Sequence, residues 1–374
     1  MERLFEHALK RLVDGLGDPG KRRAFLQRWF RRLRWAVRLL NLAWLLAVLL
    51  LWAALRWVGE GNLTLAFFLF LPPIVWLLPL IPLGLLAAAF DWRSLPVLGA
   101  TALVCVFGLM GLSIHGSNKP QPGQKALTIL TYNRGENANT SLQPFKNTVK
   151  PDVIVLQDAA FRSRRYVNSL GYEEFGYGDD IGEFTLISRY PVTWKDLVMH
   201  RGKAVAARFT LDLGGTPVAV YVVHLDTPRE PLMALRRGAF LWGVLGPLRA
   251  RWAEKRDSYE AFWHEQIAAA EAIVSRAEAE TIPCLIAGDF NAPAHGRIHQ
   301  RLTRTFTDSH DAVGFGFGYT FPGVTRNPLS LGGPWMRLDK ILGGPRWKAM
   351  WSRAEKGRPS QHCAMAAQFA LEAE

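Results

Sequence analysis

Residues 282–293 read IPCLIAGDFNAP, an apolar run that ends in the tetrapeptide Gly-Asp-Phe-Asn. A short apolar run bounded by Pro and Gly predicts a buried β-strand. A Gly-Asp pair directly after such a strand predicts a tight turn, because glycine tolerates backbone angles that other residues avoid. The stretch therefore predicts a sheet whose edge presents the carboxylate of Asp289 and, two residues later, the amide of Asn291.

Other segments of the chain share this strand-like character, and helical patterning is confined mainly to residues 259–280. Many strands with few helices predict two packed β-sheets with helices outside, an α/β fold. The remaining predicted strands are ALTILTYN (126–133), DVIVLQD (152–158), FTLISRYPV (184–192), VAARFTLDL (205–213), PVAVYVVHLD (217–226), MRLDKIL (336–342) and HCAMAAQFAL (362–371).

Most of these strands end in a side chain that can bind a metal ion or a phosphate group. Asp and Asn supply the hard oxygen ligands that Mg²⁺ prefers, and histidines serve acid–base chemistry. Taken singly, a strand-terminal Asp is more often a turn residue and a lone His is more often structural. The candidates are Asn133, Asp158, His224, Asp289, Asn291, Asp339 and His362.

The order of the motifs resembles the endonuclease/exonuclease/phosphatase superfamily, which includes pancreatic-type deoxyribonucleases and neutral sphingomyelinases. LTILTYN, LQD, ISRYP, VVHLD, IAGDFNAP, YTFP, RLDKI and a final Ser-x-His follow one another over about residues 126–370. This resemblance implies a four-layer α/β sandwich. It also implies cleavage of a phosphoester by activated water with the help of Mg²⁺ or Mn²⁺.

The same resemblance implies a role for each candidate residue. Asn133 and Asp158 would lie at the metal, and Asp289 and Asn291 would position the attacking water and the phosphate. His362 would be the general base or the histidine that stabilises the phosphate, with its ring oriented by Asp339. The second histidine of the deoxyribonuclease and sphingomyelinase branches matches His224.

Two positions depart from the family pattern. Asp158 stands where the family has Glu, one methylene longer, and Gln361 stands where the final motif has Asp. A neutral Gln is a weak ligand, which favours one metal ion over two, and Glu136 is a candidate compensating carboxylate. These departures motivate an alternative in which the domain binds a phosphate group without cleaving it.

The first third of the chain predicts three transmembrane helices, at residues 35–58, 62–90 and 95–114. Each is long enough to cross a bilayer, which takes about 20 apolar residues. The predicted organisation is a basic cytoplasmic segment (1–34), the membrane helices (35–114), a linker (115–125) and a catalytic domain (126–374). The basic stretch before the first helix and the Arg in the second loop orient the catalytic domain outside the cytoplasm. We therefore expect a multi-pass protein of the cell (inner or plasma) membrane.

Charge bears on the substrate. Residues 1–120 carry 14 Lys and Arg against 6 Asp and Glu, and residues 121–374 carry 31 against 26. The formal charge of +13 therefore lies mostly around the membrane helices, which disfavours a nucleic-acid substrate. Residues 231–252, apolar with interspersed Arg, are predicted to be either a buried helix or lid, or a segment that lies in the bilayer interface.

The preferred function is hydrolysis of a phosphoester or pyrophosphate on a membrane lipid, with the bilayer itself as partner. The arrangement of three spans before such a domain also resembles membrane proteins linked to teicoplanin resistance, and this implies a lipid-linked phosphate. The alternatives are an extracytoplasmic nuclease and the non-catalytic phosphate-binding module. Three cysteines form no disulfide framework, although Cys284 and Cys363 would pair if their strands were neighbours.

Overall fold

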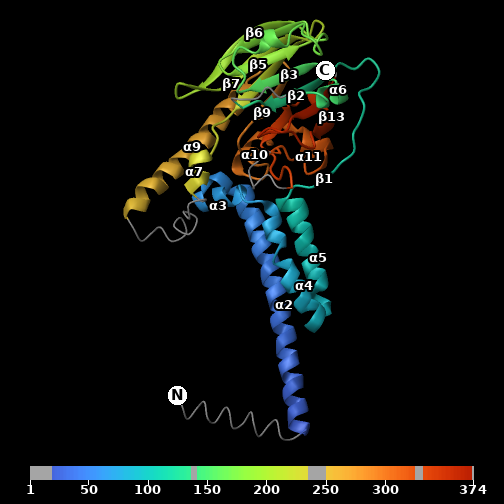
Figure 1. The fold of residues 1–374 in the computed structure, drawn as a ribbon, viewed down its shortest axis with the longest axis vertical. Coiled ribbons are helices and arrows are strands. Elements are labelled where there is room, and N and C mark those ends of the chain that lie inside the picture. Colours follow the sequence, from blue (N-terminus) through green and yellow to red (C-terminus); the bar gives the residue numbers. More distant parts are fainter. Residues whose placement is uncertain (1–18, 136–140, 235–249, 325–331, 373–374) are drawn as a thin grey trace. The chain divides into compact units, whose positions relative to one another are not determined.

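The fold was analysed in a computed structural model, which describes residues 19–135, 141–234, 250–324 and 332–372 (Figure 1). The chain forms two compact units. The first comprises Met1–Trp52 and Pro73–Leu109, and the second comprises Ala53–Pro72 and Met110–Glu374. The second unit is therefore built from two separate stretches of chain, on either side of residues 73–109.

The first unit is helical and apolar. Three of its segments are long and apolar enough to cross a membrane: Pro19–Trp57, Pro73–Phe90 and Trp92–Leu109. They contain α2 (Pro19–Trp57), η2 (Pro73–Leu77), α4 (Leu80–Phe90), η3 (Trp92–Ser94), α5 (Leu95–Leu103) and the π-helical η4 (Val104–Leu109).

Polar contacts join α2 to the turn between the second and third of these segments. Asp91 accepts two hydrogen bonds of 3.0 Å from the guanidinium of Arg38, and the Asn41 amide donates to the hydroxyl of Ser94 over 2.8 Å. Such groups are paired because an unpaired polar side chain in an apolar environment is costly.

The apolar stretch at residues 62–90 is divided rather than continuous. Asn62 accepts hydrogen bonds from the amides of Thr64 and Leu65 and thereby begins a short helix, α3 (Leu63–Leu69). Pro72 and Pro73 follow, and proline cannot donate the backbone hydrogen bond that a continuing helix needs. Helix α3 and the preceding turn η1 (Gly59–Gly61) belong to the second unit, whereas residues 73–90 belong to the first.

The second unit contains two six-stranded sheets. One has the order β10-β12-β9-β8-β7-β6 and the other β13-β14-β2-β3-β5-β4. The pairs β2–β3 and β8–β9 are parallel and the other pairs are antiparallel, so both sheets are mixed. The strands are β2 (Ala126–Asn133), β3 (Val153–Gln157), β4 (Tyr177–Ile181), β5 (Phe184–Ser188), β6 (Val192–His200), β7 (Lys203–Asp212), β8 (Pro217–His224), β9 (Cys284–Asp289), β10 (Thr307–Asp308), β12 (Asp339–Gly343), β13 (Trp347–Ala354) and β14 (Met365–Leu371).

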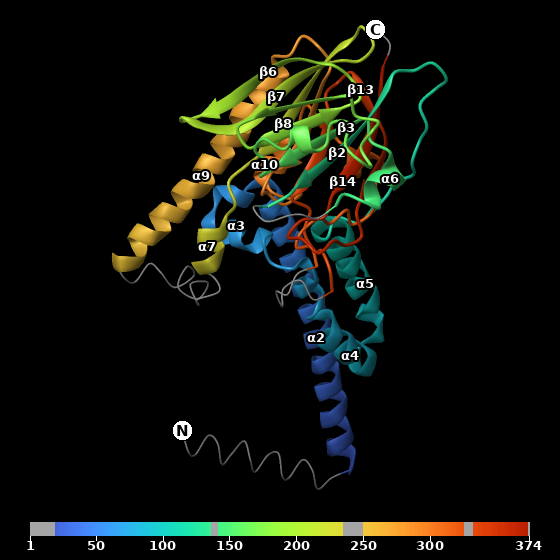
Figure 2. The same cartoon turned by 45° about the horizontal axis from the view of Figure 1, so that its top comes forward.

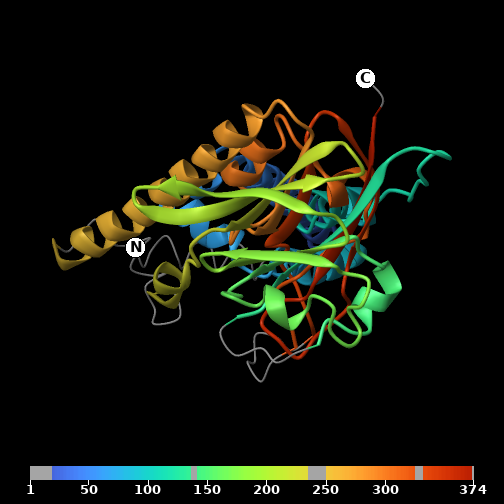
Figure 3. The same cartoon turned by 90° about the horizontal axis from the view of Figure 1, so that it is seen from above.

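The two sheets pack face to face around one large apolar core, to which Ile129, Phe209 and Phe369 contribute. On the outer face of the β6–β9 sheet lies α9 (Ala250–Glu278), which buries Ile273 and Val274 there (Figures 2 and 3). The other sheet is covered by α6 (Phe145–Val149) and the loops around Tyr172. This is the predicted four-layer sandwich, which is confirmed.

Short elements complete the unit. They are η5 (Ser163–Arg165), α7 (Arg229–Ala234), α10 (Arg297–Leu302), α11 (Ser309–Val313) and a two-stranded ribbon of β1 (Ser113–Ile114) with β11 (Phe315–Gly316). Cys284 and Cys363 are both buried free thiols, so no disulfide joins them.

Candidate active site

The candidate site lies where the carboxyl ends of the two parallel strand pairs meet. Asn133 is the last residue of β2 and Asp158 directly follows β3, while His224 ends β8 and Asp289 ends β9. His224 and Asp289 are register partners. Because parallel strands end at the same sheet edge, polar residues that are far apart in the sequence come together there.

Asp289 is the centre of this group. It is fully buried, and its Oδ2 accepts hydrogen bonds from the amide groups of Asn133 (2.8 Å) and Asn291 (3.2 Å). Its Oδ1 accepts from the backbone amide of Asn291 over 2.8 Å. Burial alone would raise the pKa of this carboxyl. The charges of His362 and His224 and these hydrogen bonds outweigh burial, so the pKa is lowered and Asp289 stays ionised.

The turn that presents Asp289 depends on Gly288. Its φ of +152° lies outside the range that residues with a Cβ favour, and a Cβ here would overlap the backbone carbonyl of Val223 on β8. We expect Gly288→Ala to destabilise the protein by on the order of 3 kcal/mol or more, because β8 and β9 would have to separate. Thermal unfolding measures this, with Gly84→Ala as the control because a Cβ at Gly84 meets no neighbour within 4 Å. An unchanged melting temperature for Gly288→Ala would contradict the close approach of β8 and β9.

His362 approaches Asp289 from the other sheet. Its Nε2 lies 3.5 Å from the Asp289 Oδ2, and its Nδ1 is hydrogen-bonded to Asp339 Oδ2 over 2.9 Å. The ring also packs against Phe321, with ring centroids 5.0 Å apart. Burial would lower the pKa of His362, but the charges of Asp339 and Asp289 outweigh it and raise the pKa to about 9.

His224 also lies close to Asp289, with its Nε2 4.0 Å from the Asp289 Oδ2. Its Nδ1 lies 3.1 Å from Glu183 and 3.8 Å from Asp158. Burial again opposes the charged form, but the hydrogen bond to Glu183 and the neighbouring carboxylates raise the pKa of His224 to about 9. Each histidine is therefore paired with its own carboxylate, His362 with Asp339 and His224 with Glu183.

Glu183 was not among the residues predicted from the sequence. It lies in the hairpin between β4 and β5, among other acids, and no strand-end pattern marks it. Only the pairing of β5 with β3, which carries Asp158 at its end, brings this hairpin to His224. One signal was available in the sequence: because His362 was expected to have a carboxylate partner, Asp339, a second acid could have been sought for His224.

The structure brings together seven of the nine site residues that were predicted from the sequence. Asn133, Asp158, His224, Asp289, Asn291, Asp339 and His362 lie in one group linked by contacts of 4.0 Å or less. Gln361 is exposed, and its backbone carbonyl accepts a hydrogen bond from Gly323. Glu136 lies outside the described residues.

The charge of the site fits a divalent cation. Asp158, Glu183 and His224 form one set of possible ligands, and Asp289, Asp339 and His362 form another. The four carboxylates outnumber the two histidines, and Lys340, whose ammonium is turned to the carbonyl of Ala292, adds one positive charge. In addition, Asp339 Oδ1 is buried and has no hydrogen-bond partner in the part of the chain that the structure describes. Negative charge therefore remains in excess, on the hard oxygen ligands that Mg²⁺ and Mn²⁺ bind.

A family model for the endonuclease/exonuclease/phosphatase family matches residues 128–362. The chain belongs to this family. Its members are metal-dependent hydrolases of phosphoester bonds, and this chain is accordingly a phosphoester hydrolase. No curated protein sequence matches the chain.

Solved structures of family members resemble the second unit at low sequence identity. A family protein from Bacteroides thetaiotaomicron is 13% identical, with a TM-score of 0.47 over 67% of this chain and 99% of that one. A 3′-5′ exonuclease from Neisseria meningitidis is 18% identical (TM-score 0.44, 65% and 99% covered). A mannosyl-6-phosphatase from B. thetaiotaomicron is 13% identical (TM-score 0.44, 65% and 99% covered).

Proposed function

We propose that this family member hydrolyses a phosphoester or pyrophosphate bond of a membrane lipid, with Mg²⁺, at the extracytoplasmic face of the cell membrane. The observation that carries the proposal is that the chain segments leaving the candidate spans pack directly on the loops of the active site. All the contacts concerned lie within the second compact unit.

The first such contact follows the third candidate span, which ends at Leu109. The next residue, Met110, accepts a 2.8 Å hydrogen bond through its carbonyl from the hydroxyl of Tyr319. Thr320 then accepts a 3.2 Å hydrogen bond from the amide of Asp339, and Phe321 packs on His362. Met110, the first residue after the third candidate span, is therefore linked through Tyr319 to a loop whose next two residues contact Asp339 and His362.

The second contact involves the turn after the first candidate span. Glu60 is buried and accepts hydrogen bonds from the backbone amides of Arg297 (2.6 Å) and Ile298 (3.4 Å), at the start of α10. The loop from Asn291 to α10 is therefore fixed by this turn. The same loop meets the end of the third span, since a Cβ added at Gly111 would lie 2.9 Å from the His295 ring.

An active site whose loops contact the residues that directly follow two candidate spans favours a substrate held in the membrane surface. A nuclease, in contrast, needs a basic track for the phosphate backbone. Next to His224 the structure instead places the two acids Asp158 and Glu183. The 231–252 segment, predicted to be a buried helix or an interfacial segment, lies mostly outside the described residues, and the proposal does not depend on it.

We infer the following roles from the geometry. Asp289, ionised and held by two Asn side chains, orients the attacking water and accepts its proton as the new bond to phosphorus forms and the bond to the leaving oxygen breaks. His362 and His224, positively charged at neutral pH, both lie within 4.0 Å of the Asp289 Oδ2. One neutralises the charge that builds on the phosphoryl oxygens, and the other donates a proton to the leaving oxygen. A bound Mg²⁺, held by Asp158 and Glu183 with Asn133, would polarise a phosphate oxygen.

The proposed orientation agrees with the two stretches of chain that make up the second unit. The turn and helix at residues 59–72 belong to the same compact unit as residues 110–374, which supports a topology in which residues 73–109 cross the membrane and return. The basic first half of α2 then belongs inside. We expect a reporter fused after Glu374 to be active if it works only outside the cytoplasm. A reporter that works only inside and is active at this position would reverse the orientation.

The substrate is tested with full-length protein in detergent and Mg²⁺. We expect phosphate release from a lipid phosphate or polyprenyl pyrophosphate in mixed micelles, and at least tenfold slower turnover of double-stranded DNA of equal phosphate concentration. Asp289→Asn protein, prepared in the same way, is the control for contaminating hydrolases. Efficient cleavage of DNA that falls steeply with salt would instead assign a nuclease.

A further inference from the structure

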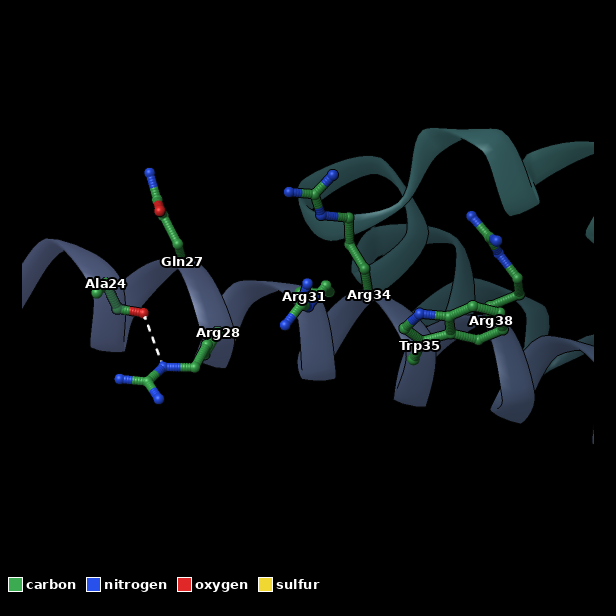
Figure 4. A pocket seen from close by; sticks show the side chains of 7 residues that line it. All are labelled: Ala24, Gln27, Arg28, Arg31, Arg34, Trp35 and Arg38. Carbon is green, nitrogen blue, oxygen red and sulfur yellow. Dashed lines mark hydrogen bonds between the residues drawn. The ribbon is translucent and has the colours of Figure 1, made fainter.

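The first half of α2 carries a dense and unbalanced positive charge. Between Pro19 and Arg38 there are eight Lys and Arg residues and no Asp or Glu, and the rest of α2 also lacks acids. Positions 27, 31, 34 and 38 recur every three or four residues, so their side chains share one face of the helix. This stripe, with its flanking residues, lines a shallow open hollow formed by Ala24, Gln27, Arg28, Arg31, Arg34, Trp35 and Arg38 (Figure 4).

The arginines that line the hollow differ in whether a carboxylate neutralises their charge. Arg38, at the end nearest the apolar half of α2, is neutralised by Asp91 and lies over the Trp35 ring, 5.2 Å from its centroid. Arg31 and Arg34 are exposed and have no carboxylate within ion-pair distance among residues 19–135, 141–234, 250–324 and 332–372. Arg28 donates a hydrogen bond to the carbonyl of Ala24, and no carboxylate of the described residues lies within ion-pair distance of it.

The position of the hollow along α2 indicates its depth relative to the bilayer. The 17 residues from 39 to 55 carry no charge, and at about 1.5 Å per residue they span about 26 Å, close to the hydrocarbon thickness of a bilayer. Arg38 then lies at the edge of the hydrocarbon, and Arg34 and Arg31 lie about 6 and 10 Å beyond it, at the depth of the lipid phosphates. Trp35, 56% exposed, has the position that interfacial tryptophans occupy.

We propose that this hollow is a binding site for the head group of an anionic phospholipid in the cytoplasmic leaflet. Guanidinium groups bind phosphate oxygens through paired hydrogen bonds, and Arg31 and Arg34 present two of them about one turn apart. A zwitterionic lipid carries its own cation beside the phosphate and gains less from this charge. The inference rests on α2 being a span and is independent of the reaction at the active site.

The experiment compares lipid binding by full-length protein in an uncharged detergent. Phosphatidylglycerol and phosphatidylcholine are titrated, and binding is measured by native mass spectrometry and by the shift in melting temperature. We expect at least tenfold tighter binding of phosphatidylglycerol to the unmodified protein. The triple variant Arg28→Gln, Arg31→Gln, Arg34→Gln is expected to lose this preference.

A matched variant removes the same charge from outside the hollow: Lys21→Gln, Arg22→Gln, Arg23→Gln. It is expected to retain the preference, which separates a site from general electrostatic attraction. Equal losses in the two triple variants, or none in either, would overturn the proposal. Competition by glycerol 3-phosphate or by a short oligonucleotide at the same concentration as the lipid would also overturn it, because the site would then bind free phosphate or nucleic acid.

Discussion

The variants Asp289→Asn and His362→Gln are each expected to lower the rate of phosphoester hydrolysis by on the order of 10³-fold. Asp289→Asn keeps the shape of a fully buried side chain but removes the charge that both histidines face. His362→Gln keeps a polar group next to Asp339 but removes the cation that we propose stabilises the phosphoryl group. Initial rates on a small soluble phosphoester with Mg²⁺ measure the effect without a requirement for lipid.

The matched control is His264→Ala, which removes an exposed histidine of α9. It is expected to leave the rate within twofold of the unmodified protein. Circular dichroism and melting temperature establish that the two site variants remain folded. Near-normal turnover by folded His362→Gln protein would exclude the proposed role of this histidine and favour a domain that binds phosphate without cleaving it.

Removal of residues 1–109 is expected to leave a domain that is much less stable than the same domain in the whole chain. Residues 53–72 bury Glu60, Phe67 and Phe70 in the second unit, and Phe70 lies 5.5 Å from the Trp263 ring of α9. Loss of one buried aromatic side chain typically lowers the free energy of unfolding by about 3–5 kcal/mol. The start of α10 would also lose the Glu60 carboxylate, which accepts hydrogen bonds from its backbone amides.

Hydrogen exchange and limited proteolysis of the truncated chain measure this loss, with α9 and α10 as the regions to follow. A milder test is Phe67→Ala in the full chain, which should lower the melting temperature by several degrees. The control is Phe107→Ala, because Phe107 belongs to the first unit and is 45% exposed. A truncated domain with the stability and exchange protection of the full chain would show that residues 53–72 contribute nothing to the fold.

The sequence predicted the strands and the main site residues because both depend on local patterns. The strand ending in Asn133 was predicted with its observed bounds, and GDFN was correctly expected to present Asp289 at a sheet edge. The fold class and the family were likewise predictable from the order of these motifs. The roles of the individual site residues remain predictions.

What escaped sequence analysis depends on tertiary contacts. Glu183 belongs to a polar hairpin. Strand β13 was not among the predicted strands, because Lys348 and Arg353 interrupt its apolar pattern. The role of residues 59–72 escaped for a different reason. Their apolar composition fits a span and a packed helix equally well, so only the contacts of Glu60 and Phe70 identify them as part of the catalytic unit.

The division of the catalytic unit into two stretches of chain has a consequence for biosynthesis. Glu60 accepts a hydrogen bond from the backbone amide of Arg297, which lies 237 residues later in the chain. At about 5–20 residues per second, translation leaves roughly 10 to 50 s in which η1 and α3 have been made but their partners have not. During this interval the apolar side chains of α3 need other cover, from lipid or from a chaperone. In the proposed topology, the catalytic unit becomes complete only after residues 73–109 have entered the membrane and returned, which would couple the appearance of activity to successful insertion.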